Sequence, residues 1–123
     1  MKKIDTAWKI FAGYILILIM LVCSSTANAQ IVVTHFNAAW NDPNKVAYIG
    51  KLTDCDIVYV DIAASPKLQT KHEIVIVPTV VIFKDGEEMK RFQADISFSM
   101  QATKEDMQDK ILTIQKENNE HND

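Results

Sequence analysis

Few side chains of this 123-residue chain can attack an electrophile or bind a transition metal: two cysteines and three histidines. They are Cys23, Cys55, His35, His72 and His121. Zinc sites need such ligands at short, regular spacings, but these histidines are scattered and Cys55 stands between two aspartates. The spacing predicts no metal site and no bound cofactor, and the sequence has neither a serine-triad pattern nor a glycine-rich phosphate loop.

The thiol of Cys55 has two interpretations, a buried small hydrophobic side chain or a free reactive group. Its neighbours Asp54 and Asp56 raise the pKa of the thiol by like-charge repulsion, which lowers the thiolate fraction at neutral pH. A monothiol enzyme that uses Cys55 is therefore kept as the alternative function.

The composition predicts one small domain, with 48% hydrophobic and 24% charged residues. This apolar content excludes a protein that is a disordered tail as a whole. Two cysteines allow at most one disulfide, which excludes a small protein stabilised by several disulfides. A formal charge of −3 provides no positive field for phosphates, so nucleic acid is not an expected partner.

The first 29 residues have the pattern of a secretory signal peptide. Lys2 and Lys3 give a basic start, an apolar or neutral run covers residues 10–22, and Ala27-Asn28-Ala29 is a small-residue exit. We expect cleavage after Ala29 and export to the periplasm or another layer of the cell envelope.

Two other interpretations of this segment stay open. In an uncleaved anchor, Trp8 and Tyr14 would lie at a membrane interface, and this would be the only contact of the chain with a membrane. A lipoprotein would be attached at Cys23, although Val22 is not the small residue that the lipoprotein peptidase usually requires there.

Cleavage makes the remaining chain distinctly acidic. It removes three lysines and one aspartate, so residues 30–123 keep ten basic and fifteen acidic side chains, a formal charge of −5. It also removes Cys23, so the mature domain cannot form an intramolecular disulfide.

Strands and helices alternate along the mature chain. Residues 31–36 and 57–62 are β-branched and apolar enough for buried strands. Between them we expect one short helix with Asp42 as N-cap and Pro43 in its first turn. Its apolar positions are Val46, Ile49 and Leu52. This βαβ unit predicts two parallel strands.

The second half predicts a helical turn, a hairpin and a last helix. The turn covers residues 66–71, and Asp85-Gly86 joins the apolar run of residues 74–83 to a fourth strand at residues 89–92. The last helix starts at a capping box formed by Thr103 and Asp106 and buries Met107, Ile111 and Ile114. Residues 117–123 form a polar, frayed tail.

Two segments resemble the thioredoxin family. Residues 36–45 read Phe-Asn-Ala-Ala-Trp-Asn-Asp-Pro-Asn-Lys, similar to the active-site segment in which a Trp precedes Cys-Gly-Pro-Cys-Lys. This match keeps Phe36, Ala38, Trp40, Pro43 and Lys45. Residues 71–87 are similar to the stretch that carries the family's cis-proline, here Pro78, and the hairpin after it.

This resemblance implies an α/β thioredoxin fold over residues 30–116. The expected architecture is a four-stranded mixed sheet, βαβ and then αββα, flanked by helices and without the family's usual first strand and helix. The active-site helix is shortened by about ten residues relative to the family.

The active-site motif is degenerate, because Asn41-Asp42-Pro43-Asn44 stands where the family has Cys-Gly-Pro-Cys. Dithiol exchange needs a low-pKa thiolate and a second, resolving thiol, and an amide supplies neither. No catalytic residue is therefore predicted. His35 replaces a buried acid of the family, and we interpret it as a core histidine rather than a catalytic one.

The resemblance also implies a surface that binds extended peptides, formed by Trp40, Val77 and Pro78. The proline has a second interpretation, in which it only shapes the start of the third strand. Asn41 and Asn44 either cap the short helix, which we favour, or donate hydrogen bonds to a ligand.

The predicted function is that of an exported, redox-inactive thioredoxin-like protein that binds an extended or unfolded segment of a protein or peptide partner. The alternative is a monothiol thioredoxin-like redox protein that uses Cys55 in envelope redox homeostasis.

Overall fold

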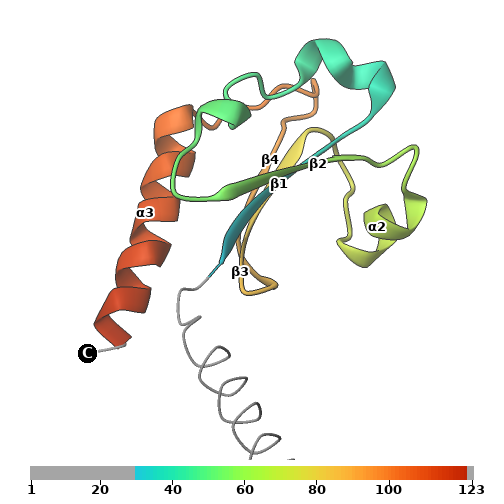
Figure 1. The fold of residues 1–123 in the computed structure, drawn as a ribbon. Coiled ribbons are helices and arrows are strands. Elements are labelled where there is room, and N and C mark those ends of the chain that lie inside the picture. The colour runs from blue at the N-terminus through green and yellow to red at the C-terminus, as the bar shows by residue number, and fades with distance from the viewer. Residues whose placement is uncertain (1–29, 122–123) are drawn as a thin grey trace, which may run out of the picture.

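β1 (Ile31–Asn37) is a central strand of the sheet, as its run of β-branched and apolar residues predicts. The computed structural model describes residues 30–121, so the predicted signal peptide lies outside the described residues. β2 (Asp56–Asp61) pairs with β1 in parallel. β3 (Thr79–Lys84) and β4 (Glu87–Gln93) complete an antiparallel hairpin in a sheet of order β2-β1-β3-β4. The four-stranded mixed sheet is therefore confirmed (Figure 1).

The connection between β1 and β2 differs from the predicted helix. It contains two short 3-10 helices, Ala39–Asn44 and Ile49–Lys51, and Lys45 between them has extended backbone angles. The expectation of an α-helix that begins at Pro43 is therefore wrong. An apolar residue at every third position also suits 3-10 turns, in which side chains three residues apart lie on one face. The side chains assigned to its apolar face, Val46, Ile49 and Leu52, are buried nevertheless.

β2 is an edge strand and not the buried strand expected from its sequence. The side chains of Val58 and Tyr59 are 43% and 63% exposed. Apolar residues indicate a strand, but burial depends on the strand order, which leaves β2 with one neighbour among the described residues.

The helical turn and the hairpin are confirmed. α2 (Pro66–Lys71) begins with its proline in the first turn. Asp85 and Gly86 both have positive φ angles, 50° and 83°, the conformation that a two-residue hairpin turn requires. The sequence pattern Asp-Gly therefore predicted both the turn and the pairing of β3 with β4.

α3 (Lys104–His121) starts at the predicted capping box. The N–H of Thr103 donates to Oδ2 of Asp106, and the N–H of Asp106 donates to Oγ1 of Thr103, at 2.8 and 3.2 Å. The predicted stripe of Met107, Ile111 and Ile114 is buried. The expected frayed tail from residue 117 is wrong as far as His121, because the helix continues to that residue; residues 122 and 123 lie outside the described range.

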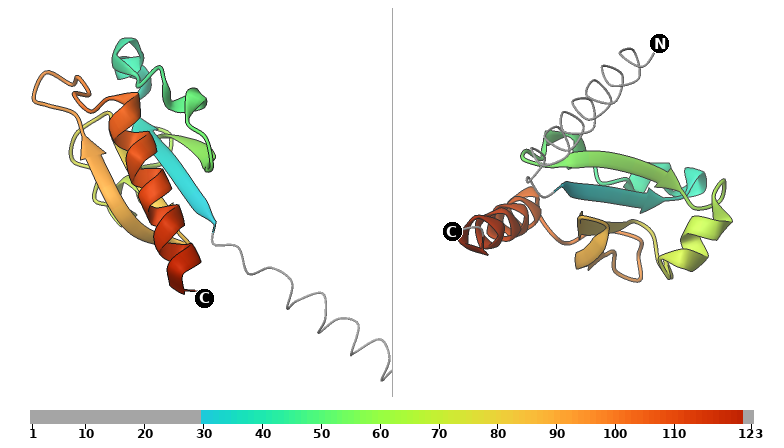
Figure 2. Two further views of the ribbon diagram at one scale, coloured as in Figure 1. Left: turned by 90° about the vertical axis from the view of Figure 1, so that its left-hand side faces the viewer. Right: turned by 60° about the horizontal axis from the view of Figure 1, so that its bottom comes forward.

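Two hydrophobic clusters pack on opposite faces of the sheet, since alternate side chains of a strand point to opposite faces. One cluster joins Val33, Val80 and Ile82 of the sheet to the buried stripe of α3. The other contains Phe36, Val77 and Val81. Figures 1 and 2 show α3 lying along one face of the sheet and α2 on the other side of the sheet. No helix within residues 30–121 is long and apolar enough to cross a membrane.

Candidate functional site

The segment that follows β1 exposes Trp40 at the end of the sheet. The indole ring is 65% exposed, although the neighbouring Ala38 is buried. Its one aromatic neighbour among the described residues is Phe98, whose ring meets it edge-on at a centroid distance of 5.4 Å. Residues 58 positions apart in sequence therefore form one apolar surface.

Phe98 belongs to the loop between β4 and α3, which Asp95 organises. The Asp95 carboxylate accepts hydrogen bonds from the N–H and Oγ of Ser97, from the N–H of Ser99 and from Nε2 of Gln101. The bond from the Ser97 hydroxyl is the main reason that the pKa of Asp95 lies below its ordinary value. The loop holds Ile96 at 95% exposure. Phe98 and Ile96 were not predicted from the sequence as site residues. The signal that could have indicated them is the presence of two large apolar residues in a serine-containing loop.

Asn41 and Asn44 do not cap a helix. Asn41 is 3% exposed, and its Nδ2 donates to Oδ1 of Asn37 at 3.0 Å. Nδ2 of Asn44 donates to Oδ1 of Asn41 at 2.9 Å, and Nδ2 of Asn37 donates to the Asn41 carbonyl at 3.3 Å. The 3-10 helix has no side-chain cap, so the favoured capping role is wrong. A hydrogen bond between side-chain amides thus joins Asn41 to Asn44. Asn37 completes this network of three asparagines, and its part in the network was not predicted from the sequence.

Asp42 and Pro43 lie between these asparagines on the surface of the same 3-10 helix. The Asp42 carboxylate lies 4.0 Å from Nζ of Lys45, and both side chains are largely exposed. An exposed ion pair at this distance contributes little to stability.

Val77 and Pro78 lie beside the start of this segment. Antiparallel pairing of Phe36 with Thr79 places Pro78 next to Asn37. The Val77–Pro78 peptide bond is cis, and the Pro78 carbonyl accepts a hydrogen bond of 3.0 Å from the N–H of Ala94, where the loop of Phe98 begins. Both side chains are buried. The N–H and carbonyl of Val77 have no hydrogen-bond partner among residues 30–121.

His35 is a satisfied core histidine, as expected from the sequence. It is 4% exposed, and its Nε2 accepts a hydrogen bond of 3.1 Å from the N–H of Val46. Burial lowers the pKa of His35 below 6.5, and the charge of Lys45 lowers it further. The neutral ring that this pKa favours is the form that can accept the Val46 hydrogen bond.

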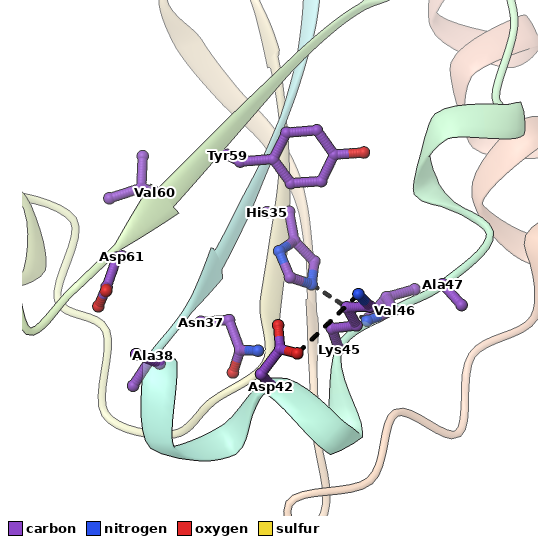
Figure 3. A pocket seen from close by; sticks show the side chains of 11 residues that line it. His35, Asn37, Ala38, Asp42, Lys45, Val46, Ala47, Tyr59, Val60 and Asp61 are labelled. Carbon is purple, nitrogen blue, oxygen red and sulfur yellow. Dashed lines mark hydrogen bonds and ion pairs between the residues drawn. The ribbon is translucent and has the colours of Figure 1, made fainter.

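Beside His35 lies an open cavity of about 630 Å³. Figure 3 shows Tyr59 and Asp61 of β2 along one side of it and Asp42 across from them. The rings of His35 and Tyr59 meet edge-on at a centroid distance of 5.7 Å. Sequence reasoning did not predict this cavity, because it depends on how the segment after β1 crosses over the sheet.

Cys55 is half-buried at the start of β2 and packs against the cluster that includes α3. Burial raises the pKa of its thiol, and the charges of Asp56 and Asp54 raise it further. The predicted direction is confirmed, with burial as the larger cause. Within residues 30–121 no group of three His, Cys, Asp or Glu side chains lies close enough together to hold a metal ion.

Curated thioredoxins are similar to this chain in sequence. The thioredoxin of Chlamydia trachomatis is 33% identical over 67 residues, which cover 50% of this chain and 66% of that protein. A thioredoxin of Staphylococcus epidermidis is 30% identical over 73 residues, covering 51% and 67%. The chain therefore spans about two thirds of the length of these relatives. No family model matches it.

Solved thioredoxin structures share the fold. A thioredoxin variant from Halobacterium salinarum superposes with a TM-score of 0.54 at 22% identity, over 73% of this chain and 79% of that one. The thioredoxin NaTrxh from Nicotiana alata gives 0.52 at 25% identity, over 76% and 82%. Fold and sequence together define a thioredoxin-fold protein with an exposed Trp40 in the segment after β1 and a cis peptide bond before Pro78. The chain belongs to the thioredoxin-like family.

Proposed function

We propose that this chain is an exported thioredoxin-like binding protein that performs no dithiol exchange and that holds an extended segment of a partner protein at the surface of Trp40 and Phe98, with the main chain of Val77 before the cis-proline as a further contact. The relatives are thioredoxins. In the proposed function, this protein retains the surface with which the family recognises partners and lacks the family's redox chemistry.

The loss of redox chemistry is supported by Asn41 and Asn44. They occupy the two cysteine positions of the motif that Trp40, Pro43 and Lys45 align with the family. Disulfide exchange proceeds by attack of a thiolate and resolution by a second thiol, and an amide can do neither. The hydrogen bond between the two asparagines also satisfies polar groups that would otherwise be buried without a partner.

The observation that carries the binding proposal is the 65% exposure of Trp40 in edge contact with Phe98. Large aromatic side chains at the surface of a folded domain are enriched at protein interfaces. Val77, which is buried, has a main-chain N–H and carbonyl without partners among the described residues, and these are the groups with which an extended peptide forms strand-like hydrogen bonds.

Two assays on the purified protein test this proposal. In the first, reduction of insulin disulfides is measured beside an active thioredoxin, and we expect no activity above background. In the second, binding of a reduced, unfolded protein is measured with Trp40→Ala and with Leu112→Ala as the matched control. Leu112 is an exposed apolar residue of α3, away from the proposed surface.

We expect Trp40→Ala to weaken binding by about 2 kcal/mol, roughly 30-fold, because a large apolar contact is lost at a candidate hot spot. Leu112→Ala should bind as the unmodified protein does. Insulin reduction at a thioredoxin-like rate, or equal binding by the two variants, would contradict the proposal.

Cys55→Ser separates the alternative function from the proposed one. The raised pKa of the Cys55 thiol disfavours the thiolate that a monothiol enzyme needs. We expect this variant to keep its partners. Loss of partners in Cys55→Ser with retention in Trp40→Ala would favour the monothiol enzyme.

A further inference from the structure

β2 (Asp56–Asp61) lies at one edge of the sheet that residues 30–121 form. Within residues 30–121 it pairs only with β1, and no strand lies on its outer side. Figure 2 shows β2 at the margin of the sheet, with β3 and β4 on the opposite side of β1. An edge of this kind can be extended by another polypeptide strand.

The main-chain groups of Ile57 and Tyr59 point to the outer side of β2. The N–H of Ile62 donates to the carbonyl of Asn37 in β1 at 2.9 Å, so it faces inward. Successive residues of a strand direct these groups to opposite sides, which turns Ile57, Tyr59 and Asp61 outward. The outward carbonyl of Asp61 is already used by the N–H of Ser65 at 3.0 Å. Ile57 and Tyr59 therefore supply both donors and acceptors on the outer side, and Asp61 adds only its N–H.

Three common protections of an edge strand, namely lysine, proline and a β-bulge, are missing from β2. Its residues read Asp-Ile-Val-Tyr-Val-Asp, with neither lysine nor proline, and its register with β1 continues without a bulge from Asp56 to Asp61. Natural edges are commonly blocked by these devices. The only charges in this strand are the carboxylates at its two ends.

These carboxylates have no cationic partner in the described part of the chain. The ion pairs there are Lys45–Asp42 and Arg91–Glu88, so Asp56 and Asp61 are not neutralised. Asp61 also lines the cavity beside His35 and Tyr59, which leaves room for a long side chain. We propose that the outer edge of β2 binds an extended segment of a partner protein that has Lys or Arg at both ends and β-branched residues between them.

A second copy of this chain fits the edge poorly. Two copies joined by a two-fold axis through β2 would pair antiparallel. Such a pair of strands can be centred on Val58 or on Tyr59. In either register, Asp61 of one copy lies opposite a residue adjacent to Asp56 of the other copy, and this occurs at both ends of the pair. The side chains of Asp61 and Asp56 then point to opposite faces of the sheet, so the four carboxylates of the pair repel one another through their shared negative charge rather than as direct cross-strand neighbours. A segment with basic ends reverses the sign of both contacts, and this site is independent of the proposed surface at Trp40.

The test uses protein purified from cells that express the full chain. The probe is a synthetic peptide of about seven residues with lysine at each end and alternating valine and threonine between, and the same peptide with glutamate ends is the control. Amide hydrogen exchange of Ile57 and Tyr59 is followed by NMR together with the affinity. We expect the lysine-ended peptide to bind more tightly, to lose affinity with salt and to slow exchange at both amides.

Two variants at one position isolate the role of the edge. Tyr59→Pro removes the outward N–H, which an edge strand tolerates, and Tyr59→Thr removes the same ring but keeps the N–H. We expect affinity to fall about tenfold further in Tyr59→Pro than in Tyr59→Thr, with both variants folded by circular dichroism. Trp40→Ala should leave this affinity unchanged, which separates the result from the proposed function.

Three outcomes would overturn the proposal. The first is equal affinity for the two peptides, and the second is equal affinity of the two Tyr59 variants. The third is protection of the Ile57 and Tyr59 amides without peptide in a dimeric protein, which would make a second copy the occupant.

Discussion

Asn41 has the burial of a core residue and an amide that is fixed on both sides, by Asn37 and by Asn44. A buried side-chain amide is stable in such a place only when its donors and acceptors are satisfied. Substitution at this position therefore affects both the folding and the chemistry of the segment after β1.

The first prediction concerns Asn41→Cys combined with Asn44→Cys, made in the Cys55→Ser background so that no other thiol of residues 30–123 interferes. We expect the two cysteines to form a disulfide under oxidising conditions and to reduce insulin measurably, because Trp40, Pro43 and Lys45 already frame the site. The rate should stay below that of an active thioredoxin. The 3-10 helix here lacks the long helix dipole that lowers the pKa of an attacking thiol.

Each single substitution is the control for this prediction, since one cysteine cannot form the pair. Absence of the intramolecular disulfide in the double variant would show that the alignment of residues 36–45 with the family is wrong.

The second prediction follows from the lowered pKa of His35. Because the folded protein disfavours protonation of this ring, the unfolded chain binds more protons below about pH 6.5. The stability that neutral His35 supports is thus fully present above pH 6.5 and is lost as the pH falls toward and through the lowered folded-state pKa. We expect the urea midpoint to fall between pH 7.5 and pH 5.

His35→Gln removes this titration while keeping a side-chain acceptor for the Val46 N–H. Its stability should fall less over the same pH interval. Some dependence should remain, because burial also lowers the pKa of His72. An equal fall in the two proteins would contradict the assignment to His35.

At the scale of elements, α3 supplies one side of the main core, and its first turn is held by the reciprocal bonds of Thr103 and Asp106. The third prediction is that Thr103→Ala lowers the free energy of unfolding by about 1 kcal/mol, since a main-chain N–H at the helix start loses its partner. Urea denaturation measures the change.

Thr113→Ala is the matched control in the same helix. Thr113 is exposed in the middle of α3, and its hydroxyl donates to the Asp109 carbonyl, so alanine there should be neutral or slightly stabilising. A cost at Thr113 equal to that at Thr103 would contradict the capping argument.

The strands, the Asp-Gly hairpin and α3 could be predicted because their signals are local. The segment between β1 and β2 could not, because apolar residues three apart fit both helix types. The burial of β2 depends on strand order, a property of the whole sheet. At the candidate site, the motifs pointed to Trp40 and Pro78 but not to Phe98 and Asn37, because the contacts of Phe98 and Asn37 are not encoded in the motifs.

At the scale of the whole molecule, the fourth prediction is that the protein is exported and begins at Gln30. The basic start, the apolar run and Ala27-Asn28-Ala29 support cleavage after Ala29. Intact mass of the protein recovered from the envelope fraction measures the N-terminus, and Ala29→Leu is the variant expected to impair processing, because the peptidase requires a small residue there. A chain that still begins at Met1 would contradict the prediction.

The loop anchored by Asp95 determines how the surface at Trp40 meets a partner. Its carboxylate accepts bonds from three residues of the loop, and Phe98 keeps a positive φ of 64°. A flexible loop loses conformational entropy when it binds a partner. The loop of Asp95 and Phe98 is already ordered in the folded protein, so it has lost this entropy before binding. The same hydrogen bonds lower the pKa of Asp95, so its carboxylate stays ionised to a lower pH than that of an ordinary aspartate. Association at this surface should accordingly carry a smaller entropic penalty than ordering the same residues from a mobile loop.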